Sequence, residues 1–233
     1  MAKEYRDLIV GLDIGTSKIM SVVAEVQSDS TLKVLGLGVS SSSGMKRGVV
    51  VNIEACVQSI QQAIREAELM AACKITRVIT GITGSHIRGR NSVGMVAVRD
   101  REVTPADVAK VLETARAINI STDQRPLLVE PQEFIIDGQE VKEPIGMSGI
   151  RLESKVHIVT CAQSAAENII KCVRRCGLEV DHLMLNPLAS SLATLTEDER
   201  ELGVVLVDMG AGTTDIAVFS GGAIRHTAVL PVA

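Results

Sequence analysis

An apolar strand followed by Asp, Gly and Thr occurs twice in this chain, and this duplication constrains the fold more than any other feature. The first copy, LIVGLDIGTSKIMSVVAEV, begins at Leu8, and the second, GVVLVDMGAGTTDIAVFSG, begins at Gly203. In each copy, runs of Val, Leu and Ile predict two buried strands, and the glycines between them predict a tight turn. One copy alone is better explained as an ordinary hairpin. Two matched copies, each at the head of a three-strand series, indicate two related halves that present the same loop.

The residue types of these two turns predict a phosphate bound together with a divalent cation. Glycine lets the backbone approach a phosphate so that successive N–H groups donate to its oxygens, and Thr or Ser hydroxyls add further donors. Asp13 and Asp208 would repel a bare phosphate, so they favour Mg²⁺, which one or two carboxylates commonly hold together with phosphate oxygens. Lys18 adds a positive charge near the first turn. Two such turns facing each other across a cleft would bind one nucleoside triphosphate.

Charge and aromatic content argue against nucleic acid as a partner. The chain has 24 Lys and Arg against 28 Asp and Glu, a net charge of −4, so no overall positive field attracts a polyanion. One Tyr, two Phe and no Trp leave almost nothing on which bases could stack.

The sequence favours the reducing cytosol. The first seven residues carry charges, and no apolar run reaches the roughly 18 residues of a membrane span, so we expect neither a secretion signal nor a transmembrane helix. Five scattered cysteines without a C-x-x-C pair argue against a disulfide framework and against a zinc site.

Periodicity predicts an α/β first domain. Strands are predicted over residues 8–14, 19–26 and 32–39, followed by an amphipathic helix over 54–72 and a strand over 76–82.

Residues 85–160 differ in character, with Gly-rich turns, one helix and two long β-like stretches. The helix has a firm start, because Thr104 is a good N-cap, Pro105 suits the first helical position and Asp107 the third. We predict a small α+β module, inserted into the first domain and lying to one side of it, away from the two turns. Its alternating apolar and polar residues, as in PLLVEPQEFIIDGQ, favour contact with other proteins.

The chain then returns to the first domain and passes into a second one. A helix ends at Gly177, and Thr196 with Glu199 forms a capping-box pattern where the second domain begins. We assign residues 1–84 and 161–195 to the first domain and residues 196–233 to the beginning of the second. Three strands without a covering layer leave an apolar face unburied, so we expect this second domain to be truncated.

This organisation resembles the actin, Hsp70 and sugar-kinase superfamily, whose two phosphate loops come from duplicated domains. More narrowly, it resembles the FtsA family of bacterial division proteins in the stretches GLDIGTSKI, SSGMKRGVVVNIE, GITGSHIRGRNSVGM, VEPQEFIIDGQ, PIGMSGIRLESKVHIVT and TEDERELGVVLVDMGAGTTDIAVFSGGAIRHT. Members of that family carry an unusual small module in the middle of their first domain. The resemblance implies an actin-like (ribonuclease H-like) first domain, the inserted α+β module and the start of a second actin-like domain.

The resemblance also implies a function and a site. It implies a scaffold that binds ATP and Mg²⁺, polymerises, tethers the FtsZ ring to the inner face of the cytoplasmic membrane and recruits later division proteins. Asp13 and Asp208 would hold the metal. The residues implied for the phosphates are Gly11, Gly15, Thr16, Ser17, Lys18, Gly210, Ala211, Gly212, Thr213 and Thr214. The adenine pocket, the FtsZ surface and the family's C-terminal membrane helix would lie beyond residue 233.

Asn186, which precedes Pro187, bears on ATP hydrolysis. Relatives that hydrolyse ATP often place Glu or Gln here, where it orients the attacking water. Asparagine can hydrogen-bond water but cannot take its proton, so we expect a slow ATPase at most. An equally good interpretation is that Asn186 is only the N-cap of the helix that follows.

Two other functions share parts of this pattern. A small-molecule kinase of the same superfamily would share both phosphate loops but needs a catalytic carboxylate and a polar substrate cleft in the first domain. An Hsp70-type chaperone needs a peptide-binding domain, which nothing here resembles. We also expect the 233-residue chain alone to bind ATP weakly, because the base pocket of this superfamily belongs to the second half of the molecule.

Overall fold

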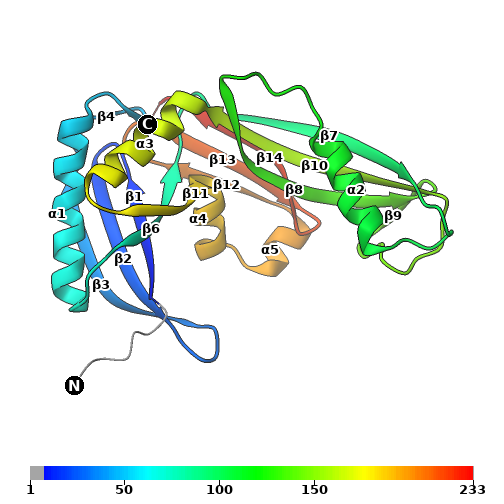
Figure 1. Cartoon of the computed structure of the whole chain (residues 1–233), viewed down its shortest axis with the longest axis horizontal. Helices are drawn as coiled ribbons and strands as arrows, with labels where there is room; N and C mark the ends of the chain where they lie inside the picture. The colour runs from blue at the N-terminus through cyan, green and yellow to red at the C-terminus, as the bar shows by residue number, and fades with distance from the viewer. Residues whose placement is uncertain (1–7, 233) are drawn as a thin grey trace.

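The computed structural model describes residues 8–232, which form an elongated molecule with three main sheets (Figure 1). The charged segment 1–7, on which the prediction about a secretion signal partly rests, lies outside the described residues. Within residues 8–232, none of the helices has the length and apolar character needed to cross a bilayer.

The first sheet has five strands in the order β11-β6-β1-β2-β3. Strands β1, β2 and β3 form an antiparallel meander, and β6 and β11 add parallel to β1. The strands are β1 (Leu8–Ile14), β2 (Lys18–Val26), β3 (Leu32–Ser41), β6 (Arg77–Ile82) and β11 (Glu179–Leu185). A small hairpin of β4 (Met45–Lys46) and β5 (Val49–Val50) follows β3.

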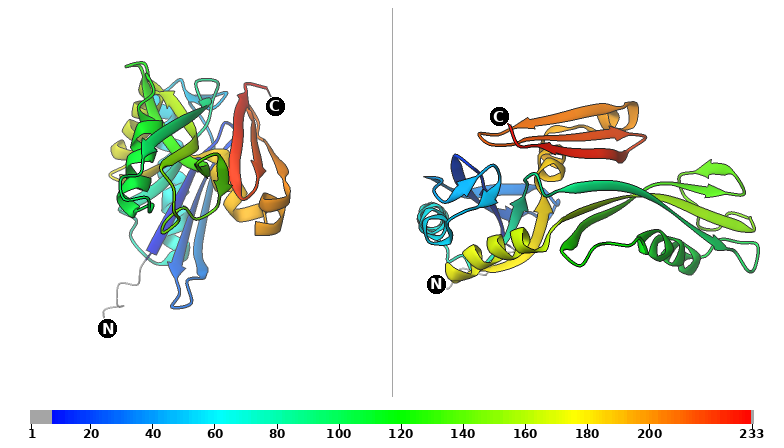
Figure 2. Two further views of the ribbon diagram at one scale, coloured as in Figure 1. Left: turned by 90° about the vertical axis from the view of Figure 1, so that its right-hand side faces the viewer. Right: turned by 90° about the horizontal axis from the view of Figure 1, so that it is seen from above.

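Helices α1 (Ile53–Ala71) and α3 (Gln163–Arg175) lie side by side and supply the apolar residues that cover the first sheet (Figure 2). Their buried faces join β1, β2 and β6 in one apolar core, as the predicted amphipathic periodicity requires. Glycine allows α1 to approach β3 closely, because a Cβ on Gly38 would lie 1.9 Å from the carbonyl oxygen of Ala63. In the sheet, β6 lies beside β1 and β11 lies beside β6.

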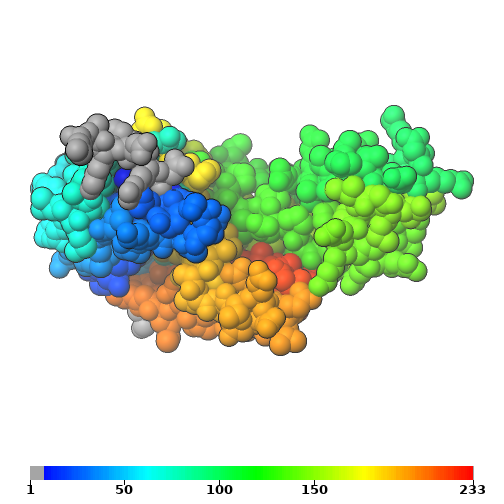
Figure 3. Space-filling view, turned by 90° about the horizontal axis from the view of Figure 1, so that it is seen from below, coloured from blue at the N-terminus to red at the C-terminus, as the bar shows by residue number. Residues whose placement is uncertain are grey.

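The second sheet has the order β7-β10-β8-β9, all antiparallel, with α2 against one face. Its elements are β7 (Arg88–Ala97), α2 (Pro105–Arg116), β8 (Gln124–Ile136), β9 (Gln139–Val141) and β10 (Arg151–Ala162). Helix α2 begins as predicted, with a capping box between Thr104 and Asp107. We call this sheet with α2 the inserted module, and it projects to one side of the molecule (Figure 3).

The third sheet is antiparallel in the order β12-β13-β14 and follows two short helices. The elements are α4 (Asn186–Thr194), α5 (Glu197–Leu202), β12 (Val204–Met209), β13 (Thr214–Ser220) and β14 (Ala223–Leu230). One face buries Ala217, Phe219 and Ile224, whereas Val205 and Val207 on β12 are exposed. This sheet therefore has one covered and one open face.

The interpretation of Asn186 as an N-cap is wrong. Helix α4 already includes Asn186, the N-cap position belongs to Leu185, and no side chain caps this end. The Asn186 side chain is instead directed into the cleft described next.

Candidate functional site

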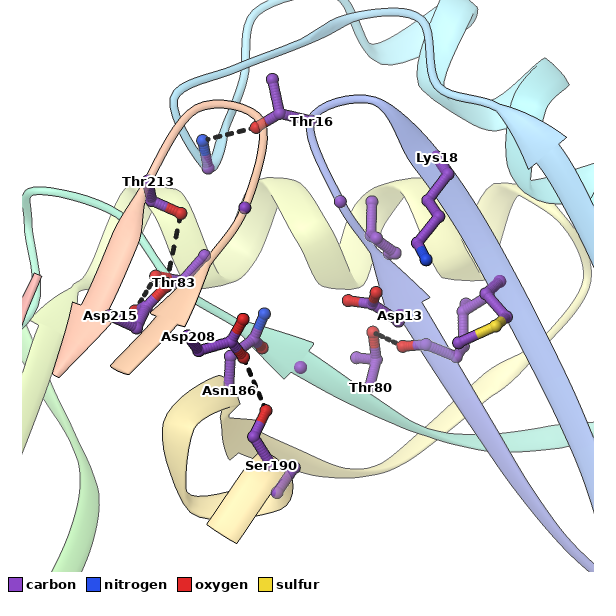
Figure 4. Close-up of a pocket in the computed structure, with 18 of the residues that line it drawn as sticks. Asp13, Thr16, Lys18, Thr80, Thr83, Asn186, Ser190, Asp208, Thr213 and Asp215 are labelled. Carbon is purple, nitrogen blue, oxygen red and sulfur yellow. Dashed lines mark hydrogen bonds between the residues drawn. The ribbon is translucent and has the colours of Figure 1, made fainter. Parts of the chain in front are cut away.

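A cavity of about 490 Å³ separates the turn after β1 from the turn after β12. Its walls come from both turns, from the end of β6 and from the start of α4 (Figure 4). All the residues predicted for phosphate or metal line it except Gly212 and Thr214. No residue between 84 and 160 does, so the inserted module lies outside the cleft.

Each of the two turns is closed by a backbone hydrogen bond between equivalent positions. The N–H of Gly15 donates to the carbonyl oxygen of Lys18 at 3.0 Å, and the N–H of Gly210 donates to that of Thr213 at 2.9 Å. A Cβ on Gly15 would lie 2.8 Å from the same Lys18 oxygen, so the first turn requires glycine there. The sequence duplication thus extends to matching backbone geometry on the two sides of the cleft.

The two turns touch at one end of the cleft. Gly212 lies against Thr16, since a Cβ on this glycine would be 2.9 Å from Thr16 Oγ1. The same hydroxyl accepts a hydrogen bond of 3.2 Å from the N–H of Gly48. Thr16 therefore ties the first turn to the loop after β4, and Gly212 allows the second turn to close onto it.

Three carboxylates enter the cleft, and Lys18 is the single Lys or Arg among its described lining residues. Burial raises the pKa of Asp13, an effect that Lys18 opposes and the charge of Asp208 reinforces. Ser190 Oγ, on α4, donates to Asp208 Oδ2 at 2.6 Å. The surplus of negative charge favours a cation, and a phosphate would enter only with one.

The third carboxylate, Asp215 on β13, was missed by sequence reasoning. It is almost fully buried and accepts hydrogen bonds from the hydroxyls of Thr83 and, at 3.3 Å, Thr213. Burial raises its pKa, and the bond from Thr83 opposes this rise. The available signal was an aspartate at the start of an apolar strand, TDIAVF, where a buried charge needs partners.

Asn186 and Gly81 form a close pair at the floor of the cleft. A Cβ on Gly81 would lie 2.1 Å from Asn186 Oδ1, so only glycine leaves room for this amide. Among the described residues, the buried Oδ1 has no hydrogen-bond partner. The amide lies next to the Asp208 carboxylate in Figure 4.

No group of three or more His, Cys, Asp and Glu side chains within the described part of the chain is close enough to form a metal site on its own. A cation between Asp13 and Asp208 would therefore need further oxygens from water or from a bound ligand.

The fold and the paired turns define an actin-like protein. Among solved structures, the chain is similar to the PilM-PilN type IV pilus biogenesis complex, with 19% identity and a TM-score of 0.68 over 97% of this chain and 62% of that one. It is also similar to the ethanolamine utilization protein EutJ from Carboxydothermus hydrogenoformans, with 18% identity and a TM-score of 0.55 over 98% of this chain and 53% of that one. The predicted fold class is confirmed.

Sequence relatives identify the family. Residues 84–160 match the family model described as the SHS2 domain inserted in FtsA. The chain is 61% identical over 227 residues to cell division protein FtsA of Pseudomonas aeruginosa, covering 97% of this chain and 54% of the relative. The FtsA of Neisseria meningitidis is 56% identical over 99% of this chain and 56% of the relative. The FtsA of Escherichia coli K12 is 49% identical over 98% of this chain and 54% of the relative. The chain belongs to the FtsA family of cell division proteins and spans about half the length of these relatives.

Proposed function

We propose that the cleft binds ATP together with Mg²⁺ and that the chain is the nucleotide-binding part of an actin-like division scaffold. The observation that carries this proposal is the pair of turns with the same hydrogen bond, each following an aspartate, on opposite walls of one cavity. Backbone N–H groups of such turns are suited to phosphate oxygens. The sequence relatives, named as division proteins, support the cellular role.

The residues of the cleft fit Mg²⁺. Carboxylate oxygens are the ligands that this cation prefers, and Asp13 and Asp208 supply them from opposite walls. The cation would neutralise the charge of phosphates that these carboxylates otherwise repel. The orphaned Asn186 Oδ1 adds an acceptor at the same place.

The phosphate contacts are proposed for lining residues of the two turns, with Lys18 as the positive charge. Gly11, on β1, leaves open space above the strand, because a Cβ there would meet nothing within 4 Å. Gly212 and Thr214 do not line the cavity. Gly212 serves the contact between the turns, and Thr214 Oγ1 donates to the carbonyl oxygen of Val232.

The proposal extends to the organisation of the whole protein. Residues 1–84 with 161–195 form the first actin-like domain, 85–160 an interaction module and 196–233 the beginning of a second actin-like domain. The whole protein self-associates into filaments and tethers FtsZ to the inner face of the cytoplasmic membrane through a C-terminal helix. Hydrolysis is slow at most, since Asn186 lacks a carboxylate. These roles are supported by the family relationship.

The test is a calorimetric titration of the whole protein with ATP, with and without Mg²⁺, in wild type and in Asp13→Ala and Asp208→Ala. Removing either carboxylate should weaken Mg²⁺-dependent binding by about 5- to 100-fold, which corresponds to about 1 to 3 kcal/mol. Asp29→Ala is the matched control, because Asp29 is an exposed aspartate between β2 and β3 of the first sheet, which also carries Asp13. Unchanged affinity in both cleft variants would refute the proposal. ADP release that depends on a small hydroxylated substrate would indicate a kinase instead.

A further inference from the structure

The inserted module makes a second contact, with β14 of the third sheet. Strand β14 lies against β7, β8 and β10, on the side of the module opposite α2 (Figures 1 and 2). The module therefore contacts the third sheet as well as the first sheet, whose apolar core includes Val159 and packs against Leu128 of the module. The sequence predicted only the connection to the first sheet.

His157 on β10 stands at the centre of this contact. Its ring is almost fully buried, with Nδ1 2.6 Å from Asn91 Oδ1 and Nε2 3.0 Å from Thr227 Oγ1. The Asn91 amide is oriented by its Nδ2, which donates to the carbonyl oxygen of Arg225, so its Oδ1 faces the histidine as an acceptor. His157 Nδ1 therefore carries the proton and donates to Asn91 Oδ1, and Nε2 accepts a hydrogen bond from the hydroxyl of Thr227. Burial, with a contribution from the charge of His226, lowers the pKa of His157 to about 4, which keeps the ring neutral as this bonding requires.

The module is shaped to receive β14. A Cβ on Gly89 would lie 2.5 Å from Thr227 Oγ1, so glycine at this position makes the space that the threonine occupies. Gln132 Nε2 donates to the carbonyl oxygen of Ile224 at 2.8 Å, and Arg225 lies 3.4 Å from Glu133. Steric fit, hydrogen bonds and an ion pair thus converge on the first five residues of β14.

The contact is connected to the cleft through Asp215, a residue that lines the cavity. Strand β14 pairs with β13 so that Val229, two residues after Thr227, is opposite Asp215. Thr83, which follows β6 and lies six residues before Gly89, donates a hydrogen bond to the same Asp215. Residues 83–89, which lead from β6 into β7, therefore contact the β13–β14 pair at two points: Thr83 bonds Asp215 in the cleft, and Gly89 lies against Thr227 at the module.

We propose that the inserted module positions the β12–β13 turn of the cleft through β14, with Asn91, His157 and Thr227 as positioning residues. None of the three lines the cavity. When this contact is lost, the β12–β14 sheet is less constrained, and the second turn no longer keeps a constant distance from the first. The ligand-binding consequence rests on the proposed function, whereas the effect on the turn does not.

The test compares Thr227→Val with Thr227→Ser in the whole protein. Valine has the same shape without the hydroxyl, whereas serine keeps the bond to His157. Thr160→Val is the matched control, because Thr160 is a buried threonine on β10, the strand that carries His157. Its hydroxyl bonds Gln124 at 3.2 Å and not β14. The primary measurement is amide hydrogen exchange of residues 208–215 without ligand, and the second is the affinity for Mg·ATP.

We expect Thr227→Val to accelerate exchange in residues 208–215 and to weaken Mg·ATP binding roughly fivefold or more, because it leaves a buried acceptor on His157 without a partner. Thr227→Ser and Thr160→Val should stay within about twofold of wild type in both measurements. Exchange in Thr227→Val that matches Thr160→Val would overturn the positioning role. If wild type itself fails to bind Mg·ATP, the proposed function is wrong, and the exchange comparison still decides this inference.

Discussion

Ser190 on α4 donates a hydrogen bond of 2.6 Å to the carboxylate of Asp208 at the end of β12. These residues lie 18 positions apart and belong to different elements, yet the bond orients one of the three carboxylates of the cleft (Figure 4). Asp208, the carboxylate proposed to hold Mg²⁺ at the second turn, is therefore oriented by the helix that follows the first sheet.

Ser190→Ala should weaken Mg²⁺-dependent ATP binding without unfolding the protein. The loss of one hydrogen bond to a charged group costs about 1.5 to 3 kcal/mol. Only part of this energy should affect ligand binding, so we expect about a three- to tenfold loss of affinity. Titration at several Mg²⁺ concentrations is the measurement, and the loss should shrink when Mg²⁺ is omitted. An equal loss with and without Mg²⁺ would contradict orientation of a metal ligand.

Gly81→Ala should act through Asn186. The added Cβ would lie 2.1 Å from Asn186 Oδ1, so the amide must leave its place beside Asp208. We expect Gly81→Ala and Asn186→Ala to have similar effects on Mg·ATP affinity, and the double variant to be no worse than Asn186→Ala alone. Additive losses in this double-mutant cycle would show that the two residues act independently.

The stability of the protein should fall with acid in a window defined by His157. Its folded pKa is about 4, below the roughly 6.5 of an unfolded histidine, so the unfolded chain binds more protons between these values. The free energy of unfolding should therefore decrease as the pH falls from about 6.5 to 4, by about 3 kcal/mol from this residue.

His157→Gln should flatten this part of the pH profile, measured by urea unfolding at several pH values. Some slope should remain, because burial and, secondarily, the charge of Arg88 also lower the pKa of His86. A variant with the wild-type slope would show that His157 is not held neutral in the folded protein.

The 233-residue chain alone should bind Mg·ATP weakly. Backbone donors, hydroxyls and carboxylates of the cleft act on groups that water also solvates well, so their net contribution is modest. We expect a dissociation constant in the high micromolar range or weaker, which corresponds to about −5 kcal/mol or less favourable. Calorimetry on the purified chain tests this, and submicromolar binding by the monomer would contradict it.

The sequence by itself determined the elements whose signals are local. The capping boxes at Thr104 and Thr196 and the left-handed glycine at Gly177 each depend on residues within one helical turn, and all three occur as predicted. The duplicated turns are also local, since the closing bonds of Gly15 and Gly210 span three residues. Such contacts form with little loss of chain entropy, so a short stretch of residues suffices to specify them.

Only the tertiary structure decided which distant side chains complete the cleft and hold its walls. Thr83 and Asp215 are 132 positions apart, and His157 and Thr227 are 70 apart. Asn186 shows the difference most clearly: local rules favour an N-cap, but the space left by Gly81 places its amide in the cleft. Contacts at such separations exist only after the sheets have packed, because packing brings the groups together and excludes the water that would otherwise satisfy them.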